Sequence, residues 1–401
     1  MSVLSGKQIL LGVTGSIAGF KAADLASKLA QAGAQVDVIL TSAGEKFITP
    51  LTFQSVTGRR AYTDHDLWGN EAHVLHVSFG KTADLLVIAP CTADTIAKLA
   101  HGITDNLLTV TALAAQCPLV IAPAMDGGMF DHPATQENLA KLKERGAVIV
   151  GPTEGHLASG LTGKGRMIEP AEIFGHIRMV LGRKGKLAGK KILVTAGGTQ
   201  EALDPVRVIT NHSSGKQGYA IAQSALDSGA DVCLVSAPTA LSAPVGARVI
   251  QVTSAQEMLD AVMSESADVL IMAAAAADFR PIQIAKDKLK KRDGIPQMEL
   301  TAAPDILKTV ASSQLSAKRF QVVVGFAAES QDLIANASEK LKSKKLDLIV
   351  ANDISANDSG FAVETNRVTL LFANGKKETL PLMSKTEVAE KIIEHTSKLL
   401  E

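Results

Sequence analysis

Cysteine and tyrosine are scarce in this chain of 401 residues, which has three cysteines and two tyrosines. Cys91, Cys117 and Cys233 lie far apart and form no Cys-x-x-Cys motif, which argues against a disulfide framework or a thiolate metal cluster. A reducing compartment is favoured, and we predict a cytoplasmic protein. Neither Tyr62 nor Tyr219 begins a Tyr-x-x-x-Lys motif, and the Gly-x-Gly-x-x-Gly spacing is also absent. These absences disfavour a dehydrogenase.

Long hydrophobic runs and a net charge are missing as well. The longest apolar stretch of interest, Val269 to Ala277, has nine residues, whereas a helix needs about 20 to span a bilayer. The 41 basic and 41 acidic residues cancel, so nothing favours broad attraction to nucleic acid or to an anionic membrane. We therefore predict no membrane or nucleic-acid partner, and an anionic ligand must be held by local groups.

The chain begins the same pattern twice. Gly6–Leu11 is echoed by Gly189–Val194, and Ala83–Ala89 is echoed by Ala267–Ala273. At 46% apolar residues, the length suffices for two domains with separate cores. The polar, glycine-containing segment between the two patterns predicts domains at 1–182 and 189–401 with a linker at 183–188. The alternative is that the echo reflects generic α/β sequence.

Short apolar runs alternate with helical stretches in both halves, which is typical of buried parallel strands in α/β proteins. The sequence predicts two doubly wound, mainly parallel, Rossmann-like sheets, with ligands at the carboxyl ends of the strands. The candidate strands are Ile9–Leu11, Val36–Leu40, Leu85–Ala89, Leu119–Ala122, Val148–Val150, Ile192–Thr195, Val232–Ser236, Val269–Ala273, Val322–Gly325 and Leu346–Ala351.

A glycine-containing turn, Gly12–Lys21, follows the first predicted strand and leads into a helix. Such a turn lets backbone N–H groups approach an anion at a helix start, although many α/β proteins have one without a ligand. Small hydroxyl residues also follow two neighbouring predicted strands. Together they indicate a site for one phosphate, with Gly15, Ser16, Ile17, Thr41, Thr92 and Thr95 as candidates.

Three histidines, His65, His73 and His76, lie close together in the first half. A metal site is one interpretation, but no cysteine or acidic set stands beside them at ligand spacing. A structural or solvated role is the ordinary one for a single histidine, and it remains open for His76.

The first half nevertheless resembles the flavin-dependent cysteine decarboxylases. The matching segments are Gly15–Ala18, His76 eight residues before Asp84, Pro90–Asp94, Gly102–Leu107 and Pro123–Met125. The resemblance implies a flavodoxin-like domain, bound FMN, and His76 as the catalytic base. A flavin fits the chemistry, because oxidation of the thiol provides the electron sink that loss of CO2 from a cysteine-derived carboxylate otherwise lacks.

Two residues depart from the decarboxylase pattern. Asp126 replaces the asparagine that usually follows Pro-Ala-Met, and Ser159 replaces the cysteine of the flexible-loop motif. Ionised aspartate repels a substrate carboxylate unless it is protonated or paired, and serine is a much poorer proton donor than a thiol. Both residues remain candidate catalytic groups.

In the second half, Gly197-Gly198-Thr199 follows a predicted strand and Asn211–Lys216 comes soon after. The Ser-Ser-Gly-Lys within the latter is similar to the end of a P-loop. Thr210 stands where that motif requires its first glycine, so we reject a Walker A site.

Five segments in order are instead similar to phosphopantothenate–cysteine ligases: Asn211–Lys216, Ala277–Arg280, Pro304–Leu307, Gly325–Glu329 and Ala351–Asp353. The resemblance implies CTP-dependent ligation through an acyl-cytidylate, in which Mg²⁺ and cationic groups offset the repulsion between two anions. Asn211 and Lys288 are the implied catalytic residues. The implied nucleotide-binding residues are Met272, Ala273, Ala274, Asp278, Pro304, Asp305, Ile306, Leu307, Phe326, Lys340 and Lys344.

Two of these lysines, Lys340 and Lys344, are four apart and would share a helical face. Lys288 belongs to a basic run, Lys286–Arg292, that is ordinarily a solvated surface. Only its place in the motif series makes Lys288 a candidate.

The leading hypothesis is a bifunctional enzyme of coenzyme A biosynthesis that ligates cysteine to 4'-phosphopantothenate and then decarboxylates the product. Its predicted partners are those small molecules and CTP, with FMN and Mg²⁺ as cofactors. The family precedent implies a homo-oligomer, with trimeric flavin domains and dimeric ligase domains whose sites are completed across subunits. The rivals are an active ligase fused to an altered flavoprotein, and a flavin-binding scaffold without activity.

Overall fold

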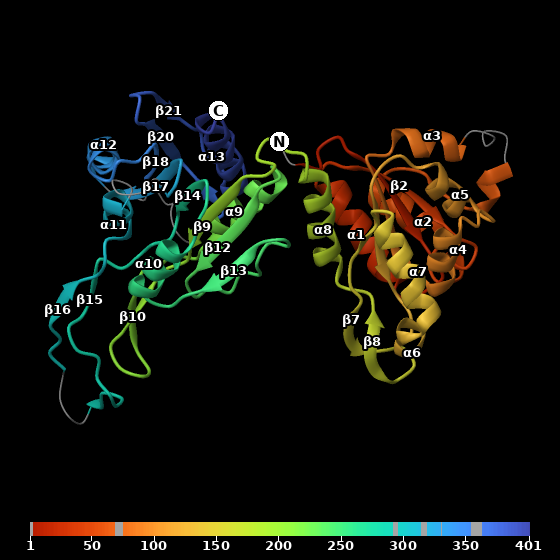
Figure 1. The fold of residues 1–401 in the computed structure, drawn as a ribbon, viewed down its shortest axis with the longest axis horizontal. Coiled ribbons are helices and arrows are strands. Elements are labelled where there is room, and N and C mark those ends of the chain that lie inside the picture. Colours follow the sequence, from red (N-terminus) through yellow and green to blue (C-terminus); the bar gives the residue numbers. More distant parts are fainter. Residues whose placement is uncertain (1–2, 69–74, 292–295, 314–318, 330, 354–362) are drawn as a thin grey trace. The chain divides into compact units, whose positions relative to one another are not determined.

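The computed structural model describes residues 3–68, 75–291, 296–313, 319–329, 331–353 and 363–401. Its contacts divide the chain into two compact units, Ser2–Leu181 and Gly182–Glu401 (Figure 1). Over the parts described, no helix combines the length and apolarity that crossing a bilayer requires.

The first unit contains an entirely parallel sheet in the order β3-β2-β1-β4-β5-β6. Without its two-residue edge strand β3, the order is that of flavodoxin-like folds, which confirms the predicted fold class. The strands are β1 (Gln8–Val13), β2 (Gln35–Leu40), β3 (Ala61–Tyr62), β4 (Leu85–Cys91), β5 (Leu119–Pro123) and β6 (Val148–Ile149).

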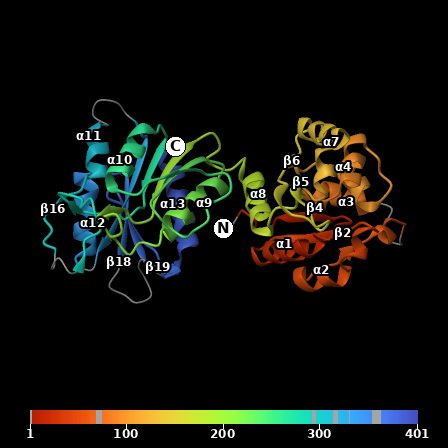
Figure 2. The same ribbon diagram turned by 90° about the horizontal axis from the view of Figure 1, so that it is seen from below.

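Helices cover both faces of this sheet (Figure 2). One core joins the sheet to α1 (Gly19–Gln31), α2 (Pro50–Thr57) and α8 (Pro170–Gly182). The opposite core includes residues of α4 (Ala93–His101), α5 (Leu107–Ala114) and α7 (Pro133–Glu144). Shorter elements are η1 (Gly44–Lys46), η2 (Asp64–Trp68), α3 (Leu75–Thr82) and α6 (Gly127–Asp131).

The second unit repeats this plan and adds an antiparallel edge, in the order β13-β12-β9-β14-β17-β18-β20-β21. The strands are β9 (Lys191–Ala196), β12 (Asp231–Ser236), β13 (Arg248–Gln251), β14 (Val269–Met272), β17 (Val322–Glu329), β18 (Leu348–Asp353), β20 (Val368–Phe372) and β21 (Lys377–Thr379). One face packs on α9 (Lys216–Asp227) and α13 (Lys385–Leu399), and the other on α10 (Ala255–Ser264), α11 (Ile306–Ser313) and α12 (Leu333–Ser343). The prediction of a doubly wound second sheet is confirmed.

The echoed Ala-Asp pairs perform the same task in both units. The Asp84 carboxylate accepts from the N–H of Gln8 at 2.8 Å, and the Asp268 carboxylate accepts from the N–H of Lys191 at 2.8 Å. Each carboxylate thus satisfies the first N–H of the central strand at its amino end, far from the ligand edge. Lys7 lies 2.8 Å from Asp84 and Lys190 lies 3.8 Å from Asp268.

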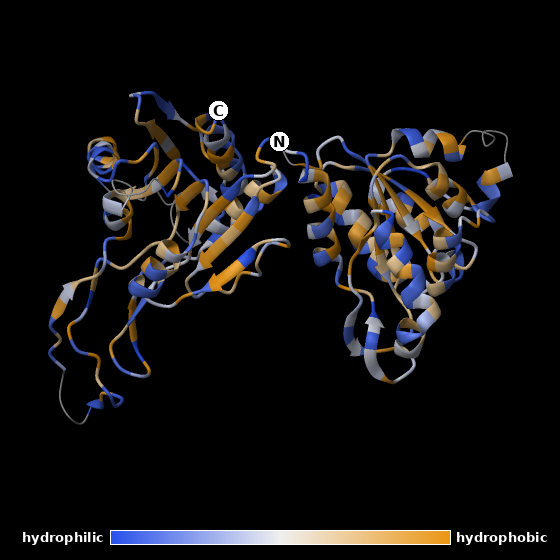
Figure 3. Ribbon diagram, viewed as in Figure 1, coloured by the Kyte–Doolittle hydropathy of each residue, from blue (hydrophilic) through white to orange (hydrophobic). Residues whose placement is uncertain are grey.

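Sequence patterns did not predict the short two-stranded sheets. Each of these strands has only two to five residues, so it lacks the apolar run that marked the sheet strands (Figure 3). Figure 1 shows β15 and β16 projecting from the second unit. The pairs are β7 (Thr153–His156) with β8 (Thr162–Arg166), β10 (Gln200–Ala202) with β11 (Val208–Thr210), β15 (Phe279–Pro281) with β16 (Leu300–Ala302), and β19 (Thr365–Asn366) with β22 (Met383–Ser384).

Candidate active sites

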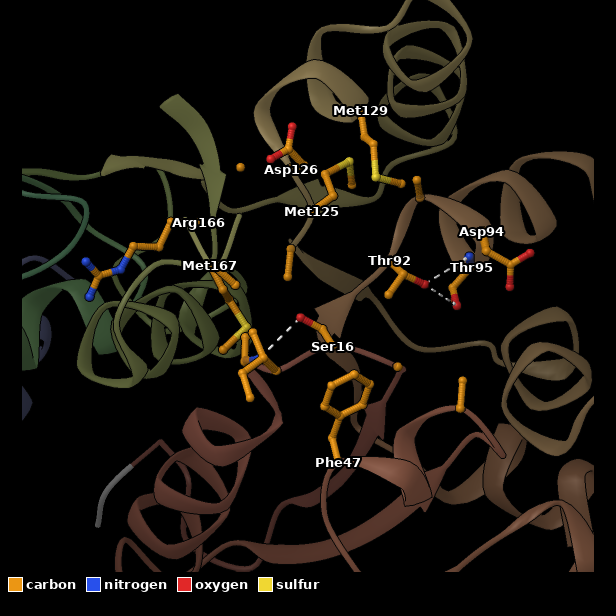
Figure 4. Close-up of a pocket in the computed structure, with 18 of the residues that line it drawn as sticks. Ser16, Phe47, Thr92, Asp94, Thr95, Met125, Asp126, Met129, Arg166 and Met167 are labelled. Atoms are coloured by element: carbon orange, nitrogen blue, oxygen red, sulfur yellow. Dashed lines mark hydrogen bonds between the residues drawn. The ribbon is translucent and has the colours of Figure 1, made fainter. Parts of the chain in front are cut away.

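A cavity of about 810 Å³ opens at the carboxyl ends of the strands in the first unit (Figure 4). Loops after β1, β2, β4 and β5 line it, together with the β7–β8 hairpin. The predicted residues that the cavity brings together are Gly15, Ser16, Ile17, Thr41, Thr92, Thr95, Asp126 and Ser159.

The loop after β1 is fixed to the loop after β4. The Thr14 hydroxyl donates to the Pro90 carbonyl at 2.8 Å and accepts from the Thr92 N–H at 3.0 Å. The Ser16 Oγ accepts from the Ala18 N–H at 3.2 Å. These bonds hold Ser16 and Thr92 on the same side of the cavity, at the start of two helices.

Thr92 is the N-cap of α4, which begins at the cavity. Its side chain accepts from the Thr95 N–H at 3.5 Å and lies 3.3 Å from the Thr95 hydroxyl. A helix start with small hydroxyl groups offers N–H donors and a favourable dipole to an anion. Gly15 is required for this packing, because a Cβ there would lie 2.6 Å from the Cβ of Ala43.

The remaining wall of the cavity is largely apolar. Sequence analysis missed Phe47, which follows β2 and is 52% exposed, and Met129 on α6, which is 51% exposed. In the sequence, each is an apolar residue on a loop or short helix that follows a predicted strand. That pattern alone does not indicate a site, because surface apolar residues are common in any protein. The cavity therefore combines a polar corner near Ser16 with an apolar surface suited to a flat ring system.

Asp126 and Ser159 form a pair on the cavity wall. The Ser159 hydroxyl donates to the Asp126 Oδ2 at 2.7 Å, and the Gly128 N–H donates to Oδ1 at 3.1 Å. These two bonds hold the pKa of the Asp126 carboxyl below its usual range. Asp126 is thus ionised at neutral pH, and the hydroxyl proton of Ser159 is directed to it.

Lys21 is a third residue that sequence analysis left without a role. It is 7% exposed, and its Nζ donates to the Met167 carbonyl at 2.9 Å and to Glu169 at 2.8 Å. Both Lys21 and Met167 line the cavity. Lys21 therefore connects α1 to the end of the β7–β8 hairpin. In the sequence, it could have been recognised as a lysine among otherwise apolar positions of a predicted helix.

His76 does not line the cavity of its own chain, contrary to the simplest expectation for a catalytic base. It lies half-buried on α3, and its Nδ1 is buried with no hydrogen-bond partner among the residues that the structure describes. His73 lies outside the described residues. Within the described ranges, no group of three potential ligands for a metal ion occurs.

In the second unit, the predicted residues lie at the carboxyl ends of β9, β14 and β17. Met272 ends β14 beside Gly325 of β17, and the Ala274 N–H donates to the Thr195 hydroxyl at 3.1 Å. The Asn211 Nδ2 donates to the carbonyls of Ala275 and Ala276 at 3.1 and 3.3 Å. The amide nitrogen of Asn211 is used in this way, which leaves its Oδ1 for a ligand.

A second group of predicted residues surrounds Asp305. Lys344, which caps the end of α12, forms an ion pair with Asp305, and the Lys340 Nζ donates to the Phe326 carbonyl at 2.8 Å. Burial raises the pKa of Asp305, but Lys344 and the Lys308 N–H outweigh it and keep that pKa below its usual range. Both lysines therefore lie close enough to Asp305 to lower its pKa.

The two groups are connected through the backbone, because the Ala303 N–H donates to the Asp278 carbonyl at 2.9 Å just before Pro304. The side chains of Ile306 and Leu307 are only 3% and 8% exposed and belong to the core beneath α11. Lys288 is exposed in the segment after β15.

Comparison with known proteins identifies both halves of the chain. A flavoprotein family model matches residues 2–182, and the model of the DNA/pantothenate metabolism flavoprotein C-terminal domain matches residues 187–400. A Bacillus subtilis protein named coenzyme A biosynthesis bifunctional protein CoaBC is 45% identical over 402 residues, covering 99% of this chain and 98% of the relative. This chain belongs to the CoaBC family.

Other CoaBC proteins match over similar lengths. The Vibrio vulnificus (strain CMCP6) protein is 46% identical and is covered completely, as is this chain. The Mycobacterium tuberculosis (strain H37Rv) protein is 42% identical over 97% of this chain and 96% of its own. A crystal structure of the C-terminal domain of a CoaBC protein is 41% identical, covers 54% of this chain and 98% of that domain, and has a TM-score of 0.46.

Membership in the CoaBC family confirms the main functional prediction. The chain is a bifunctional enzyme of coenzyme A biosynthesis with decarboxylase and ligase activities, and its first half is a flavoprotein domain. The resemblance that sequence motifs indicated therefore extends over nearly the whole length.

Proposed function

We propose that the first unit binds FMN and decarboxylates 4'-phosphopantothenoylcysteine, and that the second unit makes this substrate from 4'-phosphopantothenate, cysteine and CTP. The observation that supports the decarboxylase assignment best is the cavity beside Ser16 and Thr92. It combines hydroxyl groups and a helix start for a phosphate with an apolar wall for the flavin ring. FMN would supply the oxidation and reduction that this decarboxylation needs.

The residues of the first unit have distinct proposed roles. Ser16, Thr92 and Thr95 hold the phosphate, while Gly15 and Ile17 shape the loop and Thr41 supports the neighbouring turn by accepting from the Gly44 N–H at 3.1 Å. His76 moves a proton at the substrate. Ser159 and Asp126 contact the substrate and limit its orientation, but they do not supply its proton, since an ionised carboxylate that accepts a hydrogen bond from the serine hydroxyl has no proton to give.

His76 lies outside the cavity of its own chain, and we propose that it serves the cavity of another subunit in a homo-oligomer. The buried, unpartnered Nδ1 on the described part of α3 supports this assignment, because a buried imidazole nitrogen ordinarily has a partner.

For the ligase, we propose that the phosphopantothenate carboxylate attacks the α-phosphate of CTP, and pyrophosphate leaves. The amine of cysteine then attacks the acyl-cytidylate and displaces CMP. Lys288 offsets the charge that develops in the first step, and the Asn211 Oδ1 orients the amine in the second. Lys340, Lys344, Asp305, Asp278 and Phe326 form the nucleotide pocket with Met272–Ala274 and Pro304–Leu307. Mg²⁺ enters with the triphosphate, as it commonly does in nucleotide sites.

A single reconstitution experiment tests the whole proposal. The purified chain is incubated with 4'-phosphopantothenate, cysteine, CTP and Mg²⁺, and products are identified by mass. We expect 4'-phosphopantetheine, CMP and pyrophosphate. Accumulation of the carboxylated adduct would support an altered flavoprotein instead, and absence of both products would favour a scaffold.

Replacement of Gly15 by valine should release the flavin. The new side chain would overlap Ala43, whose Cβ lies 2.6 Å from a Cβ at this position, and would push the Ser16 loop out of place. Overpacking of this kind costs about 1–3 kcal/mol, which corresponds to a loss of FMN affinity of about 10- to 100-fold. Flavin fluorescence titration measures it. Gly163→Ala is the control, since a Cβ there meets nothing closer than 3.9 Å, and equal affinity for both variants would contradict the assignment.

Replacement of Asp126 by asparagine should lower the KM for 4'-phosphopantothenoylcysteine by about 10-fold, because one exposed repulsion of about 1 kcal/mol or slightly more is removed. The pKa of Asp126 is lowered in the folded protein, so its charge persists at neutral pH and disappears only as the pH falls through that pKa. The KM values of wild type and variant should therefore converge in acid. The control is Asp131→Asn, because Asp131 lies outside the cavity lining. Identical KM values for wild type and Asp126→Asn at pH 7 would show that Asp126 does not repel the substrate.

A further inference from the structure

The turn between β10 and β11, residues 203–207, holds a segment that lies far away in the sequence. The Ala285 N–H donates to the Leu203 carbonyl at 3.0 Å. At the other end of the segment, the Leu289 N–H donates to the Asp204 Oδ2 at 3.1 Å, and the Arg207 Nη2 donates to the Leu289 carbonyl at 2.5 Å. Lys288 therefore lies between two residues whose backbone is fixed, although its own side chain is exposed.

Asp204 is the centre of this arrangement. Its side chain is completely buried, and its Oδ1 accepts from the N–H groups of Val206 and Arg207, each at 2.8 Å. The Arg207 Nη1 lies 3.7 Å from Oδ2. Burial raises the pKa of this carboxyl, but the three N–H donors and Arg207 outweigh burial and keep the pKa below its usual value. Asp204 is thus a buried, charged acceptor whose partners come from two separate segments.

The same hairpin also carries Asn211, directly after β11. The Thr210 hydroxyl donates to the Thr199 carbonyl at 2.9 Å, and Asn211 donates to Ala275 and Ala276. The hairpin therefore connects the end of β14, where Asn211 is anchored, to the segment that carries Lys288. A change in the turn alters the position of Lys288 relative to the rest of the site.

We propose that Asp204 is a positioning residue of the ligase, which places Lys288 for the activation of the carboxylate. This inference rests on the proposed role of Lys288. The two carboxylate oxygens have separate tasks: Oδ1 closes the local turn, while Oδ2 reaches Leu289, 85 residues away in the sequence. A carboxylate that served only to close the turn would need the Oδ1 contacts alone.

The substitution Asp204→Asn separates the two tasks. Asparagine keeps an oxygen for the N–H groups of Val206 and Arg207, so the turn is retained. Its amide N–H2 group then faces the Leu289 N–H, and two donors cannot form a hydrogen bond. The variant therefore removes the long-range contact with Leu289 and the ion pair with Arg207, while the backbone hydrogen bonds that close the turn are kept.

The test measures pyrophosphate release from CTP and 4'-phosphopantothenate without cysteine, in a single turnover of the full-length protein. We expect Asp204→Asn to slow this step by about 100-fold, since displacement of a catalytic group by about 1 Å has effects of that size. The double variant, Asp204→Asn with Lys288→Gln, should be little slower than Lys288→Gln alone, because Asp204 acts through Lys288. Hydrogen exchange at the Leu289 amide, measured without substrates, should be faster in Asp204→Asn than in wild type.

The outcomes distinguish the positioning role of Asp204 from the catalytic role of Lys288. If Lys288→Gln is slow and Asp204→Asn is as fast as wild type, or if exchange at Leu289 is unchanged, the positioning role is overturned and the role of Lys288 stands. If Lys288→Gln is as fast as wild type, the proposed function of Lys288 itself is wrong, and the inference fails with it. Asp260→Asn, an exposed aspartate on α10, is the matched control. Decarboxylation of supplied 4'-phosphopantothenoylcysteine by each variant reports on sample integrity.

Discussion

Replacement of His76 by asparagine is expected to reduce decarboxylation by about 10²- to 10⁴-fold, the usual contribution of a positioned acid or base. The ligase of the same chain should be unaffected, so 4'-phosphopantothenoylcysteine should accumulate when phosphopantothenate, cysteine and CTP are supplied. FMN should remain bound with wild-type affinity, because Ser16, Thr92 and Thr95, the residues proposed to hold its phosphate, are unchanged. Product masses and flavin titration measure the two effects.

His65→Asn is the matched control, since His65 is an exposed histidine on η2 in the same unit. Full decarboxylase activity of His76→Asn would show that His76 is not the catalytic base. Loss of activity together with loss of FMN would point to a structural defect instead.

Mixing two inactive variants tests whether His76 serves another subunit. In a mixed oligomer, the His76→Asn subunits keep an intact FMN-binding loop and the Gly15→Val subunits keep an intact His76. A cavity of the first kind can therefore lie beside a histidine of the second. If sites are shared, co-refolded or co-expressed mixtures should recover a substantial part of the activity. If each cavity uses its own His76, no mixture should exceed the sum of its parts.

Replacement of Lys288 by glutamine is expected to reduce ligation by about 10²- to 10³-fold, the range found when one electrostatic stabiliser of a transition state is removed. The loss should appear in the activation step, in which two anions meet, and pyrophosphate release in the absence of cysteine measures it. Decarboxylation of supplied 4'-phosphopantothenoylcysteine should be unchanged.

Lys290→Gln provides a close control, because Lys290 is exposed in the same basic run and differs from Lys288 in position only. If both substitutions have equal effects, the run acts as a diffuse positive surface. In that case the effect of Lys288 should also fade with added salt, as exposed charges do.

Much of the fold could be predicted, because the sheet strands are apolar runs whose pattern is local. Val36–Leu40 and Val232–Ser236 lie within observed strands β2 and β12, and the echoed Ala-Asp pairs mark equivalent positions in the two units. The hairpins were not predicted. The β7–β8 hairpin is stabilised by contacts with distant residues, such as the Met125 N–H with the Gly165 carbonyl at 3.0 Å, and local patterns do not report such contacts.

The candidate sites were predictable to a different extent. Residues that directly follow strands, such as Ser16 and Thr92, could be placed because parallel strands share one carboxyl edge. The pairing of Asp126 with Ser159 could not, because they are 33 residues apart and meet only when the hairpin folds back. The same limit applies to Asp204 and Leu289, whose contact depends on two loops.

The Asp84 and Asp268 carboxylates occupy the amino edge of their sheets, opposite the ligand-binding loops. Robustness of the scaffold and substrate preference are therefore encoded at opposite ends of the same strands. Laboratory evolution of a new specificity can vary the carboxyl-edge loops while these two anchors maintain the framework. Conversely, a lower melting temperature caused by substitution of Asp84 or Asp268 can be compensated without changing the residues of the active sites.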